Sequence, residues 1–405
     1  METSLKYSQL SESLTQEISK KDKKKTGIYF TPPNTVKRNI ELLQPYLNSI
    51  TNVLEPSCGS CEYISQLKTI ENLKITGIEL NKTIFGSIES MADENLELVN
   101  SDFLTMSFDR NYDLIIGNPP YFVMKKCQVD ESYYNFFEGR PNVFILFIIK
   151  SLTLLNKDGI LSFVLPKNFL NCLYYDNTRK YINENFSILD IVECHDKYIE
   201  TQQGTVILMI QNKEPVETNN KFVINRSVYT IFATVQSVEK LKQLYENSTT
   251  LSDLGFSACI GNITWNQYKD ILTSDDSNTL LVYSSDIKKN TLEVQKYRNE
   301  KKKNYINKSG KSDPLLVINR GYGNGKYKLN YAIINETGDK EYLVENHLIC
   351  IKYNSEINKD ELIELYKKII NSFTQDKTGN FIRLYFSNNA INVAELCNIL
   401  PIYDI

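Results

Sequence analysis

Short apolar runs alternate with longer segments of mixed polarity from Gly27 to about Lys213. Runs that are apolar at successive positions are typical of strands buried on both faces of a parallel sheet. The predicted strands are Asn52–Glu55, Lys74–Glu79, Glu97–Val99, Tyr112–Gly117, Gly159–Pro166, Ile188–Glu193 and Thr205–Ile210, and the predicted helices are Asn34–Leu47, Cys61–Ile70, Lys82–Met91, Asn142–Asn156 and Tyr175–Asn185. This alternation predicts a doubly wound α/β domain. The last two strands have no helix between them, so we expect an antiparallel hairpin at one edge of the sheet.

The character of the sequence changes after Asn212. Val235–Asn247 is predicted as a helix, and from about Thr249 the chain is rich in Tyr, Asn, Lys and Gly, with short isolated strands. We therefore predict a flexible basic arm at residues 1–25. Its first part, from Ser4 to Lys20, is expected to form a weak helix, and the basic run after it to be mobile. The α/β domain is expected at residues 26–248 and a second, mixed α+β domain at residues 249–405.

The composition fits two soluble domains with their own cores. The chain has 405 residues, of which 41% are hydrophobic. Its longest obvious apolar run, Val143 to Ile149, is closed by Lys150 and is too short to span a membrane. The amino terminus lacks the basic-then-apolar pattern of a signal peptide. We therefore expect an intracellular, cytoplasmic protein with no membrane segment, whose eight cysteines are reduced thiols.

Positive charge is concentrated in two places, although the net charge is only −3. The segment from Lys296 to Tyr331 contains ten Lys or Arg residues and only two acidic residues. A second basic cluster runs from Lys20 to Lys25. Such clusters are typical of phosphate contacts, and a solvated loop gives the same pattern. The candidates for contact with nucleic acid are Lys301, Lys302, Lys303, Arg320 and Lys326. For Arg320, bidentate contact with guanine, phosphate contact and a structural ion pair all remain open.

The segment Asp113-Leu-Ile-Ile-Gly-Asn-Pro-Pro-Tyr121 carries the clearest chemical signal. Its buried strand leads into two prolines, which fix φ and hold the preceding residues extended. The Asn118 amide and the Pro119 carbonyl are therefore expected at a strand's carboxyl end, where open α/β sheets bind ligands. Two acceptors suit an –NH2 group on a base, and Tyr121 adds an aromatic face for stacking. Read alone, the four residues Asn118 to Tyr121 fit a tight surface turn equally well.

Polar groups also follow the earlier strands. The strand that ends at Glu55 leads into a turn of small residues, Pro56 to Cys61, which allows a ligand to approach the backbone closely. Glu79 ends the next strand, in a position typical of a carboxylate that binds ribose hydroxyls. Asp102 and Phe103 follow the third and suit an adenine ring with its amino group. Because the turn lacks Gly-x-Gly-x-x-Gly, a nucleoside ligand without a pyrophosphate fits best, which favours S-adenosylmethionine.

These segments together resemble the gamma-class DNA N6-adenine methyltransferases of type II restriction-modification systems. The resemblance rests on Gly27-Ile-Tyr-Phe-Thr-Pro32 (motif X), Leu54–Gly59 (motif I), Glu79 (motif II), Asp102-Phe103 (motif III) and Asn118–Tyr121 (motif IV). It covers roughly residues 27–212. It implies a Rossmann-like, S-adenosylmethionine-dependent catalytic domain, followed by a domain that recognises the target sequence in duplex DNA.

The resemblance also implies residue roles. Tyr29, Thr31, Glu55, Pro56, Ser57, Cys58, Gly59, Glu79, Asp102, Phe103, Asn118 and Pro120 would line the cofactor site. Asn118 and Pro119 would accept hydrogen bonds from the amino group of a flipped adenine, and Pro120 would belong to the same rigid segment. Tyr121 would stack on that base, and Tyr198 is the candidate for a second aromatic contact. A cognate restriction endonuclease would act on the same sites without a stable complex.

Cys61 departs from the family, which often has glycine at that position, and it creates the pair Cys58-x-x-Cys61. One such pair and two histidines, His195 and His347, are a weak basis for zinc or redox chemistry, so no metal is expected. Two other readings share the Asn-Pro-Pro-Tyr chemistry, namely an RNA methyltransferase and a protein-glutamine methyltransferase. A third is a non-catalytic nucleic-acid-binding module that keeps the fold but not the reaction. The large domain after the catalytic one favours DNA among the enzymes.

Overall fold

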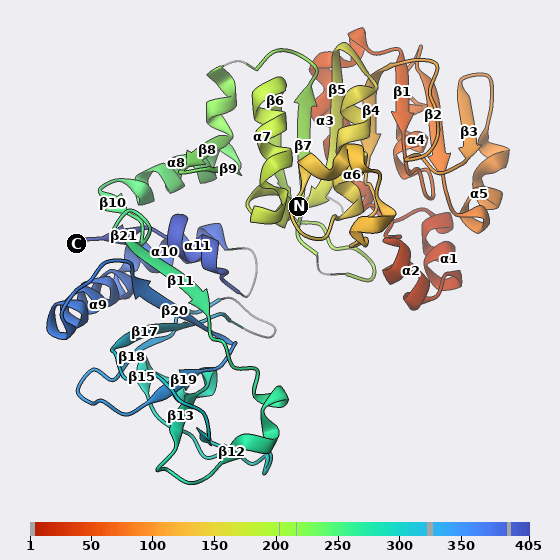
Figure 1. The fold of residues 1–405 in the computed structure, drawn as a ribbon. Helices are drawn as coiled ribbons and strands as arrows, with labels where there is room; N and C mark the ends of the chain where they lie inside the picture. Colours follow the sequence, from red (N-terminus) through yellow and green to blue (C-terminus); the bar gives the residue numbers. More distant parts are fainter. Residues whose placement is uncertain (1–4, 202, 216, 322–326, 387–389) are drawn as a thin grey trace. The chain divides into compact units, whose positions relative to one another are not determined.

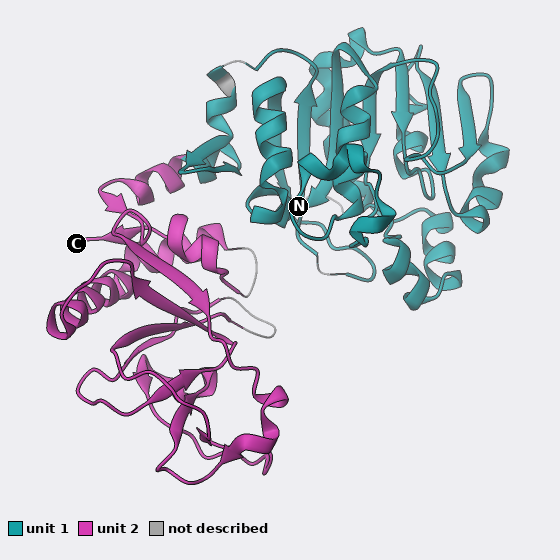
Figure 2. Ribbon diagram, in the orientation of Figure 1, with its two compact units in different colours: residues 1–238 teal, residues 239–405 magenta. Residues whose placement is uncertain are grey.

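The computed structural model describes residues 5–201, 203–215, 217–321, 327–386 and 390–405. The chain divides into two compact units, residues 1–238 and residues 239–405 (Figure 2). The division falls within the helix α8 (Val235–Tyr245). Each unit has its own sheets and its own hydrophobic clusters.

Unit 1 is built on a sheet of seven strands among the described residues, in the order β3-β2-β1-β4-β5-β7-β6 (Figure 1). The strands are β1 (Asn52–Glu55), β2 (Lys74–Glu79), β3 (Leu96–Asn100), β4 (Tyr112–Gly117), β5 (Leu155–Pro166), β6 (Ser187–Cys194) and β7 (Thr205–Gln211). The first five are mutually parallel, whereas β7 lies antiparallel between β5 and β6. The predicted doubly wound α/β fold and its antiparallel edge hairpin are confirmed.

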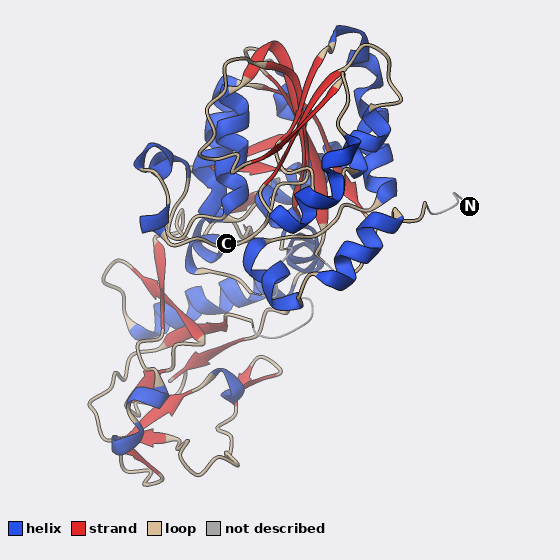
Figure 3. Ribbon diagram, turned by 90° about the vertical axis from the view of Figure 1, so that its right-hand side faces the viewer, coloured by secondary structure: helices blue, strands red, loops and turns tan. Residues whose placement is uncertain are grey.

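Alternate residues of each central strand face two different cores. Leu54, Ile115 and Leu161 belong to one hydrophobic cluster, whereas Val53, Leu114 and Ile160 belong to the other. The first cluster is closed by α6 (Val143–Thr153) and α7 (Asp176–Asn185), and the second by α3 (Pro33–Leu43) and α4 (Glu62–Leu67). Figure 3 shows helices on both sides of the twisted sheet. Burial on both faces explains why the strands are apolar at successive positions.

The apolar run from Val143 to Ile149 lies in α6, which is buried among the side chains of the first cluster. A helix that is apolar on all sides is typical of a protein core. None of the helices in the described ranges is both long enough and apolar enough to cross a membrane.

Most predicted elements appear within a few residues of their expected bounds. Strands β1, β2 and β4 have the predicted limits. Strand β5 begins four residues earlier than predicted, at Leu155 rather than Gly159, because its ladder with β4 contains an irregularity between Tyr112 and Leu114. The helix predicted at Asn34–Leu47 ends as α3 at Leu43 and continues as a 3-10 helix, Gln44–Ser49, because Pro45 has no N–H to extend the α-helical ladder.

The amino-terminal segment is helical, and the prediction of a flexible basic arm is wrong. It forms α1 (Gln9–Glu17) and α2 (Lys20–Thr26), whose N-caps are Ser8 and Ser19. Leu14 of α1 is buried against Phe30 and Ile84 of the α/β domain. Side-chain capping and this apolar contact therefore outweigh the repulsion within the basic run.

Unit 2 is a mixed α+β structure. One antiparallel sheet contains β11 (Phe256–Ile260), β20 (Leu348–Tyr353), β17 (Leu315–Asn319) and β18 (Tyr331–Ile334), and a mixed sheet contains β12 (Leu272–Thr273), β16 (Tyr305–Ile306), β13 (Thr279–Val282) and β19 (Tyr342–Val344). The helices of this unit are α9 (Lys359–Thr374), α10 (Asp376–Tyr385) and α11 (Val393–Asn398). The remaining paired strands are β8 (Val223–Arg226) with β9 (Tyr229–Phe232) in unit 1, and β10 (Ser248–Thr249) with β21 (Ile402–Tyr403) and β14 (Ile287–Lys288) with β15 (Thr291–Leu292) in unit 2.

Candidate active site

A cleft lies at the carboxyl ends of β1 and β4, which are neighbours in the sheet. Its accessible volume is about 30 Å³, well below the roughly 300–1,000 Å³ of typical ligand pockets, so the cleft is narrow. The residues that line it come from three separate segments: Tyr29, Phe30 and Thr31; Glu55, Ser57, Cys58, Gly59, Ser60, Glu62 and Tyr63; and Asn118. The fold therefore brings together the predicted motifs X, I and IV around one space.

The Asn118 amide is held by its neighbours at both ends. Nδ2 donates to the backbone carbonyl of Tyr29 at 3.2 Å, and Oδ1 accepts from the Tyr121 hydroxyl at 2.5 Å. Because a carbonyl only accepts, the contact with Tyr29 sets which end of the amide is the nitrogen. Ser57 also donates to the backbone carbonyl of Asn118 at 3.3 Å. The amide oxygen is thus held as an acceptor whose second lone pair can take another donor.

Tyr121 is fixed through its hydroxyl. Besides Asn118 Oδ1, the backbone carbonyl of Val164 lies 2.7 Å from the Tyr121 oxygen, so the single hydroxyl proton is donated to one acceptor at a time. The ring packs edge-on against Phe144 of α6, with centroids 6.0 Å apart. The residue as a whole is partly exposed. This arrangement leaves an immobilised aromatic side chain beside the Asn118 acceptor.

Gly27 fixes the chain that enters motif X directly against motif IV. It ends α2 with φ +70°, a left-handed conformation that favours glycine. A Cβ atom at this position would lie 2.7 Å from the backbone nitrogen of Tyr121 and 3.0 Å from Cβ of Pro120. No side chain fits between these two backbones, so α2 and the Asn-Pro-Pro-Tyr segment are held together.

Glu55 places a carboxyl group in the cleft with one oxygen unpaired. Its side chain is 3% exposed, and Oε2 has no hydrogen-bond partner among the described residues. Burial, with added repulsion from Cys61, Glu79 and Glu62, raises the pKa of Glu55 well above its ordinary value. A buried acceptor without a partner costs free energy, and a positively charged ligand in the cleft would satisfy it.

Glu79 holds the motif I turn through a hydrogen bond to its backbone. Its carboxylate accepts from the backbone N–H groups of Gly59 at 2.9 Å and Asn81 at 2.6 Å. Burial raises the pKa of Glu79, whereas these two backbone donors lower it. Glu79 therefore fixes the loop that forms the cleft wall, and it retains lone pairs for ribose hydroxyls.

Cys58 and Cys61 stand in the turn as buried thiols, 4% and 0% exposed. A hydrogen bond with Cys61, followed by burial, raises the pKa of the Cys58 thiol well above its ordinary value, which disfavours the reactive thiolate. Cys61 adopts φ +63°, the left-handed conformation that explains why glycine is frequent at this position in the family it resembles. Within the described ranges, no three or more His, Cys, Asp or Glu side chains are grouped as a metal site.

Phe103 was predicted to offer an open face for stacking on adenine, but it lies in the hydrophobic core. Phe103 is 2% exposed, and its ring centroid lies 5.0 Å from that of Phe147 and 5.7 Å from that of Phe108. The Lys150 ammonium lies 5.2 Å from the centroid of the Phe103 ring. The apolar side chain is drawn into the core, so the structure does not bring it to the cleft. Asp102 is partly exposed, and its Oδ1 caps the next turn by accepting from the N–H of Leu104 at 2.9 Å.

Tyr198, the predicted second aromatic residue, lies close enough to Tyr121 for their hydroxyl groups to interact. The segment that carries it joins β6 to β7, and its side chain is 7% exposed. Burial raises the pKa of Tyr121 well above its ordinary value, and the neighbouring Tyr198 adds to this shift. The two hydroxyl groups thus interact although their segments are 77 positions apart in the chain.

Sequence reasoning missed part of the site. Ser60, Glu62 and Tyr63 line the cleft, and α1 reaches it through Ser11, which hydrogen-bonds Ser60 at 2.7 Å and also donates to Glu62. The available signal was the Ser8–Ser11 spacing ahead of a helical pattern, which is typical of an N-cap. That signal predicts a helix but not the surface on which the helix packs.

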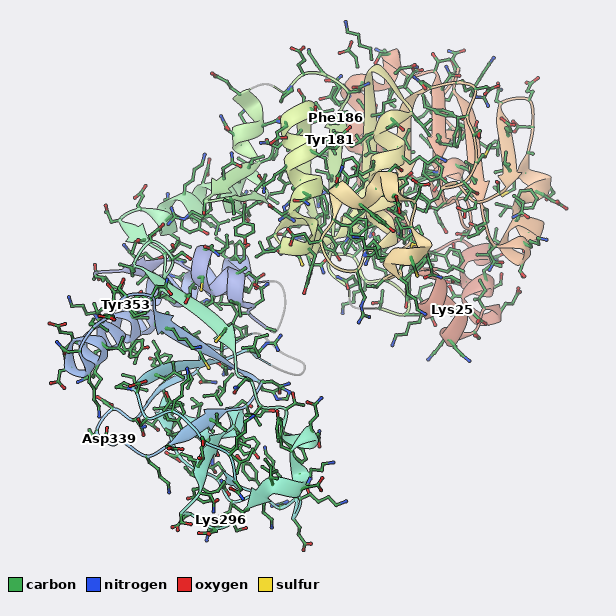
Figure 4. The ribbon with its side chains drawn as sticks, viewed as in Figure 1. Lys25, Tyr181, Phe186, Lys296, Asp339 and Tyr353 are labelled. Carbon is green, nitrogen blue, oxygen red and sulfur yellow. The ribbon has the colours of Figure 1, made fainter. Side chains whose placement is uncertain are left out.

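The predicted DNA-contacting residues of unit 2 divide into different environments. Lys301 is exposed, as is Lys296, which Figure 4 labels at the edge of this unit. Lys302 is half-buried, with its ammonium 4.0 Å from the ring centroid of Tyr283 and 3.9 Å from that of Tyr297, so it stabilises the unit rather than presenting an open charge. Lys303 is half-buried.

Arg320 is half-buried as well, and its guanidinium donates to the Asn346 carbonyl at 3.4 Å. This contact fits the structural alternative for Arg320, although it occupies one of five donors. Lys326 lies outside the described residues.

Comparisons with known proteins find similar chains among restriction-modification methylases. Residues 33–199 match the family model described as Eco57I restriction-modification methylase. The chain is 28% identical over 386 residues to the type II methyltransferase M.CvrRI of Paramecium bursaria Chlorella virus XZ-6E. The aligned residues cover 93% of this chain and 93% of that protein. It is 24% identical to the modification methylase CviBIII of Paramecium bursaria Chlorella virus NC1A, over 98% of this chain and 99% of that protein. The chain is similar to type II restriction-modification methyltransferases.

A solved structure supports the fold over both units. The DrdV–DNA complex matches 94% of this chain and 57% of its own, with a TM-score of 0.54 and 13% sequence identity. At this identity the likeness concerns the arrangement of elements. It extends over both units, beyond residues 33–199, which match the family model.

Proposed function

We propose that this chain is a site-specific DNA methyltransferase that transfers a methyl group from S-adenosyl-L-methionine to N6 of adenine. The observation that carries the proposal is the Asn118 amide, oriented by the Tyr29 carbonyl at the edge of the cleft formed by the motif I turn. Relatives over almost the full length of the chain are named as type II or modification methylases. The target in DNA and the choice of adenine N6 follow from this likeness together with the chemistry of the site.

The residues of the cleft fit a cationic nucleoside cofactor. Glu55 offers a buried oxygen without a partner to a positive charge, and Glu79 offers lone pairs to ribose hydroxyls. Gly59 and the other small residues of the turn leave room for close backbone approach. When bound, S-adenosyl-L-methionine supplies a methyl group activated by its sulfonium.

The chain's own contribution to the reaction is to hold and polarise the amino group. An aromatic amine is a weak nucleophile because its lone pair is delocalised into the ring. Hydrogen bonds from its two protons to Asn118 Oδ1 and to the Pro119 carbonyl favour a pyramidal nitrogen and stabilise the positive charge that develops there. A rigid acceptor pair also aligns the nitrogen with the methyl donor, and alignment alone can be equivalent to about 10⁵ M or more.

The target base must leave the duplex to reach this site, at a cost on the order of a few kcal/mol. Stacking on an aromatic side chain returns roughly 1–3 kcal/mol per base. We assign that contact to Tyr121, whose hydroxyl is anchored on β5, and to Tyr198 beside it. Unit 2, with its concentration of Lys and Arg, is the proposed target-recognition domain. A restriction endonuclease acting on the same sites is a functional partner, without a stable complex.

Transfer of tritium from labelled S-adenosyl-L-methionine tests the proposal. Duplex DNA from a host without adenine methylation, total RNA and cell protein are compared as acceptors, and labelled DNA is then digested to nucleosides and separated. The expected product is N6-methyladenine in duplex DNA. Label in RNA, in protein glutamine or in a cytosine would contradict the proposal, as would cofactor binding without transfer to any acceptor.

The two environments of neighbouring lysines give a further test. Lys301→Glu is expected to weaken binding to DNA of any sequence and to reduce the slope of log K against log salt by about 1 or more, because an exposed phosphate contact is lost. Lys302→Met is expected instead to lower the free energy of unfolding by about 0.5–2 kcal/mol through loss of its contacts with Tyr283 and Tyr297.

Fluorescence anisotropy between about 50 and 200 mM salt measures the first effect, and thermal denaturation measures the second. If Lys301→Glu leaves the salt slope unchanged, this part of unit 2 is a solvated loop and does not contact phosphates.

A further inference from the structure

One lysine of the amino-terminal basic run is buried, and it contacts the segment that carries Tyr198. Lys23 is 3% exposed, whereas Lys21, Lys24 and Lys25 on the same helix are exposed; Figure 4 labels Lys25 at the periphery. The Lys23 ammonium lies 2.5 Å from Glu200 Oε2 and donates to the carbonyl of Thr15 in α1. Burial of a lysine is costly unless it is paired and hydrogen-bonded, so this position is a specific structural choice within the run.

Further contacts tie the same segment to the amino-terminal part of the chain. The Tyr7 hydroxyl donates to the carbonyl of Lys197 at 3.4 Å, and Asp196 accepts from Thr35 of α3 at 2.8 Å. A small cavity is lined jointly by Lys23, Tyr29, Tyr198 and Glu200, together with Thr15. Residues 196–200 are therefore held by Tyr7, which precedes α1, by Lys23 of α2 and by Thr35 of α3.

The opposite ends of these helices contact the cofactor turn and motif IV. Ser8 and Ser11 of α1 donate to Glu62, at the start of α4, and Ser11 also bonds Ser60 in the turn. Gly27, four positions after Lys23, is packed on the backbone of Tyr121. The helix pair α1–α2 thus connects the turn that would hold the cofactor with the two aromatic residues that would hold the base.

We propose that Lys23 is a positioning residue, which through Glu200 holds residues 196–200 so that Tyr198 stands against Tyr121 at the target-base site. The inference rests on the proposed function for the identity of the base. Lys23 touches neither the reacting atoms nor the motif I turn, so its loss should slow transfer to DNA and leave cofactor affinity nearly unchanged. Glu200, which is more exposed, should act as the partner of the same pair.

The test compares Lys23→Met with Lys24→Met in the full-length protein. Both variants lose one positive charge from α2, but Lys24 is exposed, so the control separates the local contact from a change in net charge. Glu200→Gln removes the partner charge at a more exposed site, and the double variant Lys23→Met/Glu200→Gln completes a double-mutant cycle. The readouts are the single-turnover rate of tritium transfer to duplex DNA, the cofactor Kd by calorimetry, the unfolding temperature, and the rate of trypsin cleavage after the exposed Lys197.

For Lys23→Met and for Glu200→Gln, we expect the single-turnover rate to fall about tenfold or more, with cofactor Kd within about twofold of wild type and cleavage at Lys197 accelerated. The double variant should be no slower than the slower single variant, and Lys24→Met should match wild type. Rates equal to those of Lys24→Met, additive losses, or loss of stability alone at an unchanged transfer rate would overturn the inference.

The cleavage readout separates this inference from the proposed function. If wild-type protein transfers no label to DNA, the proposed function fails, whereas unchanged cleavage at Lys197 in Lys23→Met contradicts the positioning role whatever the substrate.

Discussion

Asn118→Ala is expected to lower the single-turnover rate of methyl transfer by about 10²–10³-fold, with cofactor affinity changed no more than a few-fold. This size is typical of the loss of one preorganised hydrogen-bond acceptor or donor that acts on charge developing in the transition state, about 2.7–4 kcal/mol. The amide oxygen is the acceptor, and its position depends on the Tyr29 carbonyl and the Tyr121 hydroxyl. Cofactor affinity is spared because the other residues that line the cleft, among them Glu55, Ser57 and Gly59, are unchanged.

Tyr121→Phe is the matched control for this effect. It removes the hydroxyl that donates to Asn118 but keeps the ring packed on Phe144, so the acceptor loses one restraint and stays in place. We expect a much smaller loss of rate than for Asn118→Ala. Rapid-quench measurement with saturating cofactor distinguishes the two. A rate for Asn118→Ala near that of wild type would remove Asn118 from the catalytic mechanism.

The second large effect concerns Glu55. Its pKa is raised, chiefly by burial, so the carboxyl group keeps its proton to a higher pH than an exposed carboxyl group does. A cationic cofactor beside it would favour the carboxylate, and binding would release that proton. Affinity should therefore rise with pH above the ordinary carboxyl pKa and level off above the raised pKa of Glu55. Glu55→Gln should remove this pH dependence and weaken binding at high pH by about 10–100-fold, as for loss of a charge-assisted hydrogen bond.

Calorimetry in buffers of different ionisation enthalpy measures the proton release directly. At a pH between the ordinary and the raised pKa of Glu55, the wild-type protein should release a proton on binding and Glu55→Gln should release less. Glu62→Gln is a suitable comparison, because Glu62 also lines the cleft but is engaged by Ser8 and Ser11. Equal proton release in wild type and Glu55→Gln would show that Glu55 is not the group that meets the positive charge.

The same shift has a consequence for stability in the absence of cofactor. Between the ordinary and the raised pKa of Glu55, the unfolded chain has lost the proton and the folded chain retains it. The folded state then binds more protons, so this residue's contribution to stability decreases as pH rises through that interval. Glu55→Gln should flatten the dependence, which thermal denaturation across the pH range measures.

Much of the catalytic domain could be read from local sequence patterns. Strands such as Lys74–Glu79 and Tyr112–Gly117 are short apolar runs closed by turn residues. Such runs are typical of strands that are buried on both faces of a parallel sheet. The parallel order of these strands then places Glu55, Glu79 and Asn118 at one edge of the sheet. The Asn-Pro-Pro-Tyr segment is similarly local, since two prolines restrict its backbone wherever it lies.

Residues whose roles depend on distant partners could not be assigned in this way. Nothing in the run Lys20–Lys25 distinguishes Lys23, because its burial depends on Glu200, 177 positions later. Phe103 has the residue type expected of an adenine contact, but its neighbours Phe108, Phe147 and Lys150 take up its ring. Likewise, Lys302 has the same charge as Lys301 and is distinguished only by the two tyrosines around it.

The sequence by itself therefore determined the strands of the seven-stranded sheet, their order along the chain and the groups presented at the strand ends, because those features follow from local periodicity and backbone restriction. Only the tertiary structure decided which charged and aromatic side chains are open to a ligand and which are enclosed. That difference arises because burial and pairing depend on contacts between segments far apart in the chain, which no local pattern specifies.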